Sequence, residues 1–120
     1  MKKVGPESAV LKAVMDYLTH IKRWPCWRRN VGGGRFQNPS GKQYFVRFAE
    51  VGQSDVWFIA DGGIHGEIET KAPGRKPSPE QYNWLESVNR AGGIAIWCCS
   101  VDECEFKLKA IFIERGIKWR

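Results

Sequence analysis

Apolar residues near the start of the chain recur with the period of a helix. Five of them follow this spacing, so their side chains share one face. They are Val10, Leu11, Val14, Leu18 and Ile21. Pro6 suits the first turn of a helix, and Trp24-Pro25 closes the pattern. The spacing predicts a helix from Glu7 to about Ile21.

Three later runs are rich in β-branched and aromatic residues, which favour strands. They are Tyr44–Glu50, Asp55–Ala60 and Ile64–Lys71. Asp61-Gly62-Gly63 separates the last two runs and is a typical hairpin turn. Residues 24–43 contain several glycines and a turn signal at Asn38-Pro39-Ser40-Gly41, and they predict an irregular segment.

The second half of the chain carries clear helix boundaries. Ser78-Pro79-Glu80-Gln81 has an N-cap serine, a proline at the first helical position and a glutamine placed to complete a capping box. The helix that follows ends at Gly92-Gly93. Ile94–Cys98 is a short apolar strand that we expect to be central and buried on both faces. A last helix runs from Ser100 to near Gly116.

These elements predict a single α/β domain over residues 1–120, with the order α-β-β-β-α-β-α and a mixed central sheet flanked by helices. The chain has 19 Lys and Arg against 13 Asp and Glu, a net charge of +6. This charge favours a polyanionic partner and excludes a mainly acidic scaffold. No apolar run approaches the roughly 18 residues of a membrane span, and the N-terminus is polar. We expect a cytoplasmic chain whose four cysteines are reduced thiols.

The most informative feature is the acidic hairpin formed by the last two of the three predicted strands. With a three-residue loop at 61–63, Ala60 opposes Ile64, and counting outward places Asp55 across from Glu69. Two opposed carboxylates repel each other unless a cation lies between them. A two-residue loop would instead place these carboxylates on opposite faces of the sheet.

Two carboxylates and a backbone carbonyl suit a hard ion with oxygen ligands such as Mg²⁺. Lys71, two residues beyond Glu69 and on the same face, can position or help deprotonate a metal-bound water. This set of groups serves phosphodiester hydrolysis. The alternative is an exposed strand face whose acidic and basic residues only contact solvent.

Three segments, taken in order, resemble the VRR-NUC family of the PD-(D/E)xK nuclease superfamily. They are Gly52-Gln53-Ser54-Asp55, Ile68-Glu69-Thr70-Lys71-Ala72-Pro73-Gly74 and Ser78-Pro79-Glu80-Gln81. The resemblance covers Glu7 to about Ser100. It implies a restriction-endonuclease-like fold and a Mg²⁺- or Mn²⁺-dependent DNase, often active on branched DNA such as four-way junctions. A small nuclease of this kind suits a bacterium or a phage-infected cell.

The resemblance also implies roles for individual residues. Asp55, Glu69 and the backbone carbonyl of Thr70 would bind the metal, and Lys71 would be the catalytic lysine. Thr70 replaces the apolar residue usual between Glu and Lys in the family, and we expect its side chain to face away from the site. Glu7 and Gln81 fit the family's two helical motif positions. Glu7 could also serve only the helix dipole, and Gln81 only the capping box, although its two roles can alternate.

Basic and aromatic residues alternate in the predicted irregular segment. We expect five basic residues to contact DNA, because such groups neutralise phosphates. They are Arg28, Arg29, Arg35, Arg75 and Lys76. Glu67 and His65 share the face of Glu69 but are expected to be surface polar residues rather than a second metal site.

A further expectation concerns the whole molecule. A four-way junction needs two symmetric nicks, and the apolar Ile111-Phe112-Ile113 faces more than one side of its helix, so we expect a homodimer. The alternatives to a dimeric nuclease that cleaves junctions are a basic nucleic-acid-binding module without catalysis, and a monomeric flap or nicking nuclease.

Overall fold

Four strands form a mixed sheet at the centre of the molecule, in the order β1-β4-β5-β6. They are β1 (Cys26–Arg28), β4 (Val56–Ala60), β5 (Ile64–Thr70) and β6 (Ile94–Cys98). The β1–β4 and β4–β5 pairs are antiparallel, whereas β5 and β6 are parallel. The structure is a computed structural model, which describes residues 5–29, 33–47 and 52–120.

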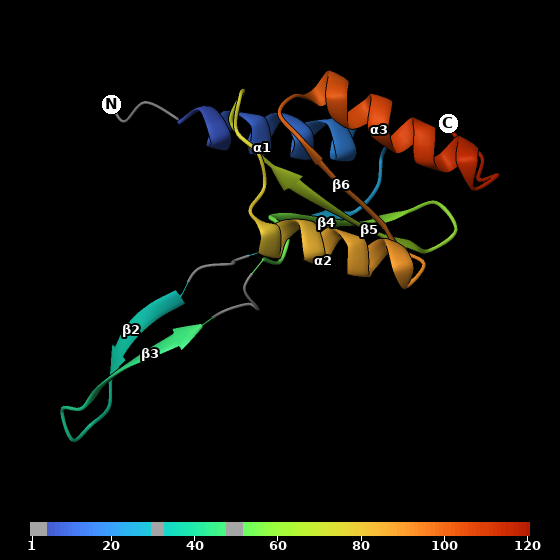
Figure 1. Ribbon diagram of the computed structural model, residues 1–120. Coiled ribbons are helices and arrows are strands. Elements are labelled where there is room, and N and C mark those ends of the chain that lie inside the picture. The colour runs from blue at the N-terminus through green and yellow to red at the C-terminus, as the bar shows by residue number, and fades with distance from the viewer. Residues whose placement is uncertain (1–4, 30–32, 48–51) are drawn as a thin grey trace.

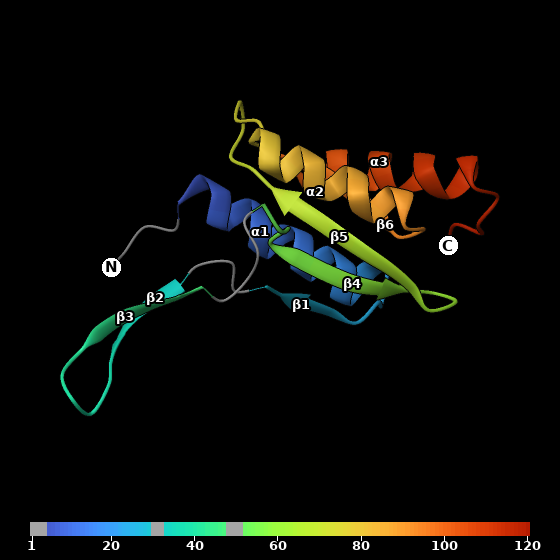
Figure 2. The same ribbon diagram turned by 60° about the horizontal axis from the view of Figure 1, so that its bottom comes forward.

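Three helices cover the two faces of this sheet (Figures 1 and 2). They are α1 (Pro6–Asp16), continued by a π-helical turn η1 (Tyr17–Ile21), α2 (Pro79–Arg90) and α3 (Val101–Glu114). Apolar side chains of α1 and α3 pack with Phe58, Ile68 and Ile96 in the main core. Leu85 and Val88 of α2 pack against Ala95 on the opposite face. Among the described residues, no helix is long and apolar enough to cross a membrane.

The hairpin of β4 and β5 has the three-residue loop, the one of the two alternatives that the metal hypothesis requires. Ala60 pairs with Ile64, and the ladder continues to the pair Val56–Ile68. One residue beyond this pair, Asp55 and Glu69 lie on the same side of the hairpin end. Gly66 pairs with Phe58, and a Cβ at Gly66 would lie 2.0 Å from the Phe58 ring, so the strand needs glycine here.

The prediction of an irregular segment over residues 24–43 was wrong. This stretch contains β1 and also β2 (Gly33–Gln37), which pairs with β3 (Gln43–Arg47) in a separate two-stranded sheet. The predicted strand Tyr44–Glu50 therefore exists as β3, but it lies outside the central sheet, where β1 takes its place. Residues 48–50 of that prediction lie outside the described residues.

The prediction of a central position for the apolar strand was also wrong, because β6 lies at an edge of the four-stranded sheet. Its burial was predicted correctly: Ile94, Ile96 and Cys98 belong to the main core, and Ala95 faces α2. Helices on both faces bury this strand, although β5 is its only paired neighbour within the described part of the chain. All four cysteines are free thiols.

Candidate metal centre

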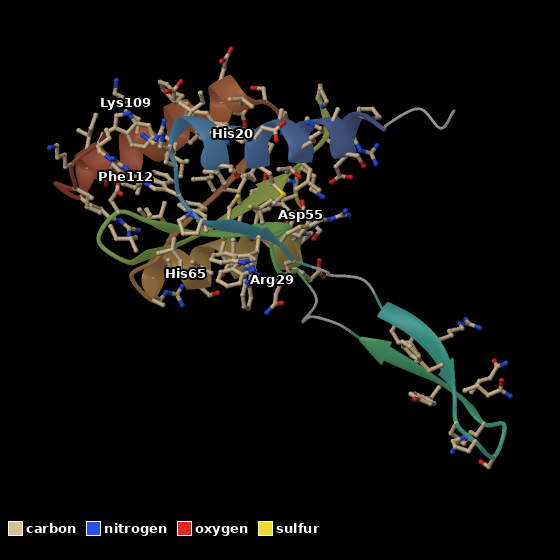
Figure 3. All side chains as sticks on the ribbon, turned by 180° about the vertical axis from the view of Figure 1, so that it is seen from behind. His20, Arg29, Asp55, His65, Lys109 and Phe112 are labelled. Carbon is tan, nitrogen blue, oxygen red and sulfur yellow. The ribbon has the colours of Figure 1, made fainter. Side chains whose placement is uncertain are left out.

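Three carboxylates meet where β5 ends and where α1 and α2 begin. Glu7 lies in the first turn of α1, Asp55 immediately precedes β4, and Glu69 belongs to β5. One oxygen atom of each lies within 4.8 Å of the other two. Figure 3 shows Asp55 at the end of the sheet from which the β2–β3 hairpin leaves the body. The structure therefore brings together carboxylates that are 62 residues apart in the sequence at their extremes.

Glu69 is the buried member of this cluster, with 2% of its surface exposed. Its Oε1 accepts a hydrogen bond from Gln81 Nε2 at 2.9 Å and lies 3.6 Å from Lys71 Nζ. Its Oε2 is buried and has no hydrogen-bond partner. Burial and the neighbouring Asp55 carboxylate raise the pKa of Glu69 to about 8, although the Lys71 ammonium opposes the shift. A cation at Oε2 would satisfy the unpartnered oxygen.

Asp55 is held by the strand that carries Glu69. Its Oδ2 accepts hydrogen bonds from the backbone N–H of Thr70 at 3.1 Å and from Thr70 Oγ1 at 3.0 Å. The expectation that the Thr70 side chain faces away from the site was therefore wrong, because its hydroxyl orients a predicted ligand. The Asp55 carbonyl also accepts a hydrogen bond from the backbone N–H of Arg29, at 2.6 Å.

The loop before Asp55 approaches the start of α2 closely. Gly52 has φ +88°, and a Cβ there would lie 2.6 Å from the carbonyl oxygen of Glu80. Only glycine accepts both this backbone conformation and this contact. The glycine of the G-x-S-D motif therefore lets the chain pass the N-terminus of α2 just before Asp55.

Gln81 completes the capping box and contacts Glu69 at the same time, whereas we expected these two contacts to alternate. Its Oε1 accepts a hydrogen bond from the backbone N–H of Ser78, at 2.8 Å, while Ser78 Oγ accepts one from the backbone N–H of Gln81. Its Nε2 remains free to donate to Glu69. The capping box thus fixes the side chain that holds Glu69.

Glu7 and Lys71 complete the cluster from two sides. The Glu7 side chain is about half exposed, and its Oε1 lies 3.9 Å from Lys71 Nζ. The Lys71 side chain is only 17% exposed, so its ammonium stays between the carboxylates of Glu7 and Glu69. A hollow of about 160 Å³ opens beside them. Its lining residues are Glu7, Ser8, Leu11, Arg28, Asp55 and Thr70.

Glu67 was expected at the surface, but it is 2% exposed and lies in a hydrogen-bonded cluster. Its Oε1 accepts from Arg29, at 2.5 Å, and from Trp84 Nε1, at 2.8 Å, and its Oε2 lies 2.7 Å from Nε2 of the exposed His65. Burial raises the pKa of Glu67, but hydrogen bonds from Arg29, His65 and Trp84 outweigh it and leave the pKa lowered. Because side chains alternate along a strand, the sequence placed Glu67 on the same face as Glu69. Its burial becomes apparent only from the position of α2.

The five basic residues predicted to contact DNA occupy different surroundings. Arg28 is exposed at the hollow of the metal centre, and Arg75 and Lys76 are exposed in the loop after β5. Arg35 is exposed on β2. Arg29 differs from these four, because its guanidinium is paired with buried Glu67 (Figure 3 shows Arg29 on the same side of the sheet as His65).

The cluster has the donor set of a hard divalent ion. Its three carboxylates offer oxygen ligands, and the buried Glu69 Oε2 has no hydrogen-bond partner among the residues that the structure describes. Thr70, whose carbonyl was predicted as a ligand, lines the same hollow. Comparisons with known protein families, with curated proteins and with solved structures gave no match.

Proposed function

We propose that this chain is a divalent-metal-dependent endonuclease that hydrolyses DNA phosphodiester bonds with Mg²⁺ or Mn²⁺. Branched DNA, such as a four-way junction, is the preferred substrate class that the sequence resemblance implies. The observation that carries the proposal is the environment of the Glu69 carboxylate. A buried carboxylate with one unpartnered oxygen lies beside Asp55 and Glu7, with the Lys71 ammonium 3.6 Å from its other oxygen.

The residues of the cluster divide the work between them. Gln81 and Lys71 both engage Glu69 Oε1, which leaves Oε2 available as a ligand. The two hydrogen bonds from Thr70 to Asp55 Oδ2 leave Asp55 Oδ1 for the ion. A bound divalent ion lowers the pKa of a coordinated water and neutralises charge on a phosphate oxygen. Lys71 is the group placed to orient that water, because its ammonium lies beside Glu69 Oε1.

The arrangement of the body also supports the proposal. With η1 taken as part of the first helix and β2 and β3 set aside, the elements up to β6 follow one another as α-β-β-β-α-β, which is compatible with the core order that the sequence resemblance implies. Arg28 lines the same hollow as Asp55 and places a guanidinium where a DNA phosphate would enter. A binding module without catalysis would need the cations but not an acidic cluster with one buried carboxylate and an adjacent lysine.

The test is cleavage of a supercoiled plasmid and a labelled four-way junction with Mg²⁺, with Mn²⁺ and with EDTA. The wild-type protein is expected to nick both substrates with either metal and neither substrate with EDTA. Glu69→Ala should lower the cleavage rate by roughly a hundredfold or more, because it removes the buried ligand.

Glu114→Gln is the matched control, since it removes a carboxylate from the exposed end of α3, and it should cut at the wild-type rate. If pure Glu69→Ala protein cut at the wild-type rate, the acidic cluster would not be the active site. DNA binding without cleavage under every metal condition would favour the binding module.

A further inference from the structure

The β2–β3 hairpin extends away from the sheet and its helices as a separate arm (Figures 1 and 2). The radius of gyration is 16.1 Å, whereas a compact domain of this length has about 14 Å. A two-stranded sheet on its own gains little stability and leaves side chains of both faces in solvent. The metal centre described above does not use this arm.

The charged residues of the arm are all basic. Residues 33–47 contain Arg35, Lys42 and Arg47 but neither Asp nor Glu. Aromatic side chains are exposed along it, with 63% of Phe45 and 48% of Tyr44 accessible to solvent. A cationic surface with exposed rings suits a polyanion that also has flat apolar groups.

The register separates the two faces of the arm. Arg35 pairs with Phe45 and Gln37 pairs with Gln43, so these four side chains share one face, which we call the Arg35–Phe45 face. On the other face Phe36 pairs with Tyr44, and their rings stack with centroids 5.9 Å apart. Rings of the second face thus contact each other, whereas the four named residues of the first face offer the Arg35 guanidinium, the amides of Gln37 and Gln43 and the strongly exposed Phe45 ring. Gln37 Nε2 also donates to the Gly41 carbonyl at 3.2 Å, which leaves its Oε1 and a second N–H for a ligand.

We propose that the Arg35–Phe45 face binds an unpaired segment of a nucleic-acid strand. Arg35 contacts a phosphate, Phe45 stacks on a base, and the amides of Gln37 and Gln43 hydrogen-bond to base edges. Base faces are accessible only where a strand is unpaired, as at the branch of a junction or flap. The proposal rests on the proposed function in taking DNA as the substrate. A second copy of the chain is a poorer occupant, because it would bring an equally cationic arm and a net charge of +6.

The experiment measures the affinity of the full chain for a labelled oligo(dT) single strand and for a matched duplex, by fluorescence anisotropy in EDTA. The test variant is Arg35→Ala with Phe45→Leu. Its control is Lys42→Ala with Phe36→Leu, which removes one positive charge next to the turn and one ring from the Phe36–Tyr44 face. The test variant should bind the single strand about tenfold or more weakly, because it loses one stacking ring and one phosphate contact. The control should stay within about threefold of wild type.

Each other outcome overturns the proposal. If the test variant bound with wild-type affinity, the arm would not be a binding surface. If it lost the same affinity for the single strand and the duplex, the arm would bind by charge alone and no base would stack on Phe45. If the test variant instead had a different molar mass from wild type in light scattering, the arm would be an interface between copies of the chain. Since EDTA prevents metal-dependent cleavage, this result is independent of whether the chain proves to be a nuclease.

Discussion

Two buried glutamates on one strand show how neighbouring groups determine what a carboxylate can do. Glu67 accepts hydrogen bonds from Arg29 and Trp84, and His65 contacts its second oxygen, so both of its oxygens are satisfied. Glu69, two residues later, keeps a buried oxygen without a partner. Burial is similar at the two positions, and the difference in partners makes Glu67 structural and Glu69 available to a cation.

The pKa of Glu69 predicts how stability depends on pH in the metal-free protein. Because this pKa is raised from 4.5 to about 8, the folded state binds more protons than the unfolded state between these values. Stability should therefore fall as pH rises from about 5 to 8, by at most a few kcal/mol at about 1.4 kcal/mol per unit.

Urea unfolding in EDTA at a series of pH values measures this slope, and Glu69→Gln should flatten it. The lowered pKa of Glu67 acts below pH 5, where stability is lost on acidification, so it leaves this window clear. Constant stability of the wild type from pH 5 to 8 would contradict the assigned state of Glu69.

Asp55→Asn tests the second ligand. Thr70 holds one oxygen of Asp55, and the amide that replaces the carboxylate is a much weaker ligand for a hard divalent ion. Calorimetric titration with Mn²⁺ should show an affinity at least about tenfold lower than that of wild type. An unchanged Mn²⁺ affinity would place the ion elsewhere.

At the level of elements, the N-terminus of α2 connects helix formation to the metal centre. Ser78→Ala removes the acceptor of one capping hydrogen bond and should lower the free energy of unfolding by about 1 kcal/mol, with cleavage retained. Gln81→Ala should cost a similar amount of stability but also raise the Mn²⁺ concentration needed for half-maximal cleavage, because it releases Glu69. Identical Mn²⁺ dependence of the two variants would reduce Gln81 to a cap.

The elements that the sequence predicted well are those with local signals. The period of 3.6 predicts the first helix, the capping box predicts the start of α2, and Asp61-Gly62-Gly63 predicts the hairpin turn between β4 and β5, although the loop length came only from the structure. These features depend on neighbouring residues alone, and the pairing of β4 with β5 follows from them.

The elements that the sequence missed depend on distant partners. Cys26–Arg28 is only three residues long and becomes a strand because β4 pairs with it. Glycines at the start of β2 oppose strand formation, and β3 supplies the pairing that overcomes this. The hydroxyl contact of Thr70 and the burial of Glu67 likewise depend on side chains brought together by the fold, which no local pattern contains.

At the level of the whole molecule, the exposed side of α3 bears on the expected homodimer. Leu108 and Phe112 are buried, whereas Phe106 and Ile113, seven residues apart, are 75% and 62% exposed. Residues at this spacing lie on one face of a helix. Light scattering across a dilution series should give twice 13.7 kDa at micromolar concentration, and Phe106→Asp with Ile113→Asp should give the monomer. A wild-type mass of 13.7 kDa would favour a monomeric nicking nuclease.

The central claim is that the acidic cluster hydrolyses DNA and does not merely accompany a DNA-binding surface. Lys71→Ala separates the two most directly, since Lys71 lies between Glu69 and Glu7 and affinity for DNA comes mostly from other cations. Cleavage of a four-way junction with Mn²⁺ should fall by roughly a hundredfold or more, while junction binding stays within about twofold of wild type. Lys109→Ala, which removes an exposed lysine from α3, should leave both unchanged. Cutting by Lys71→Ala at the wild-type rate would contradict the claim.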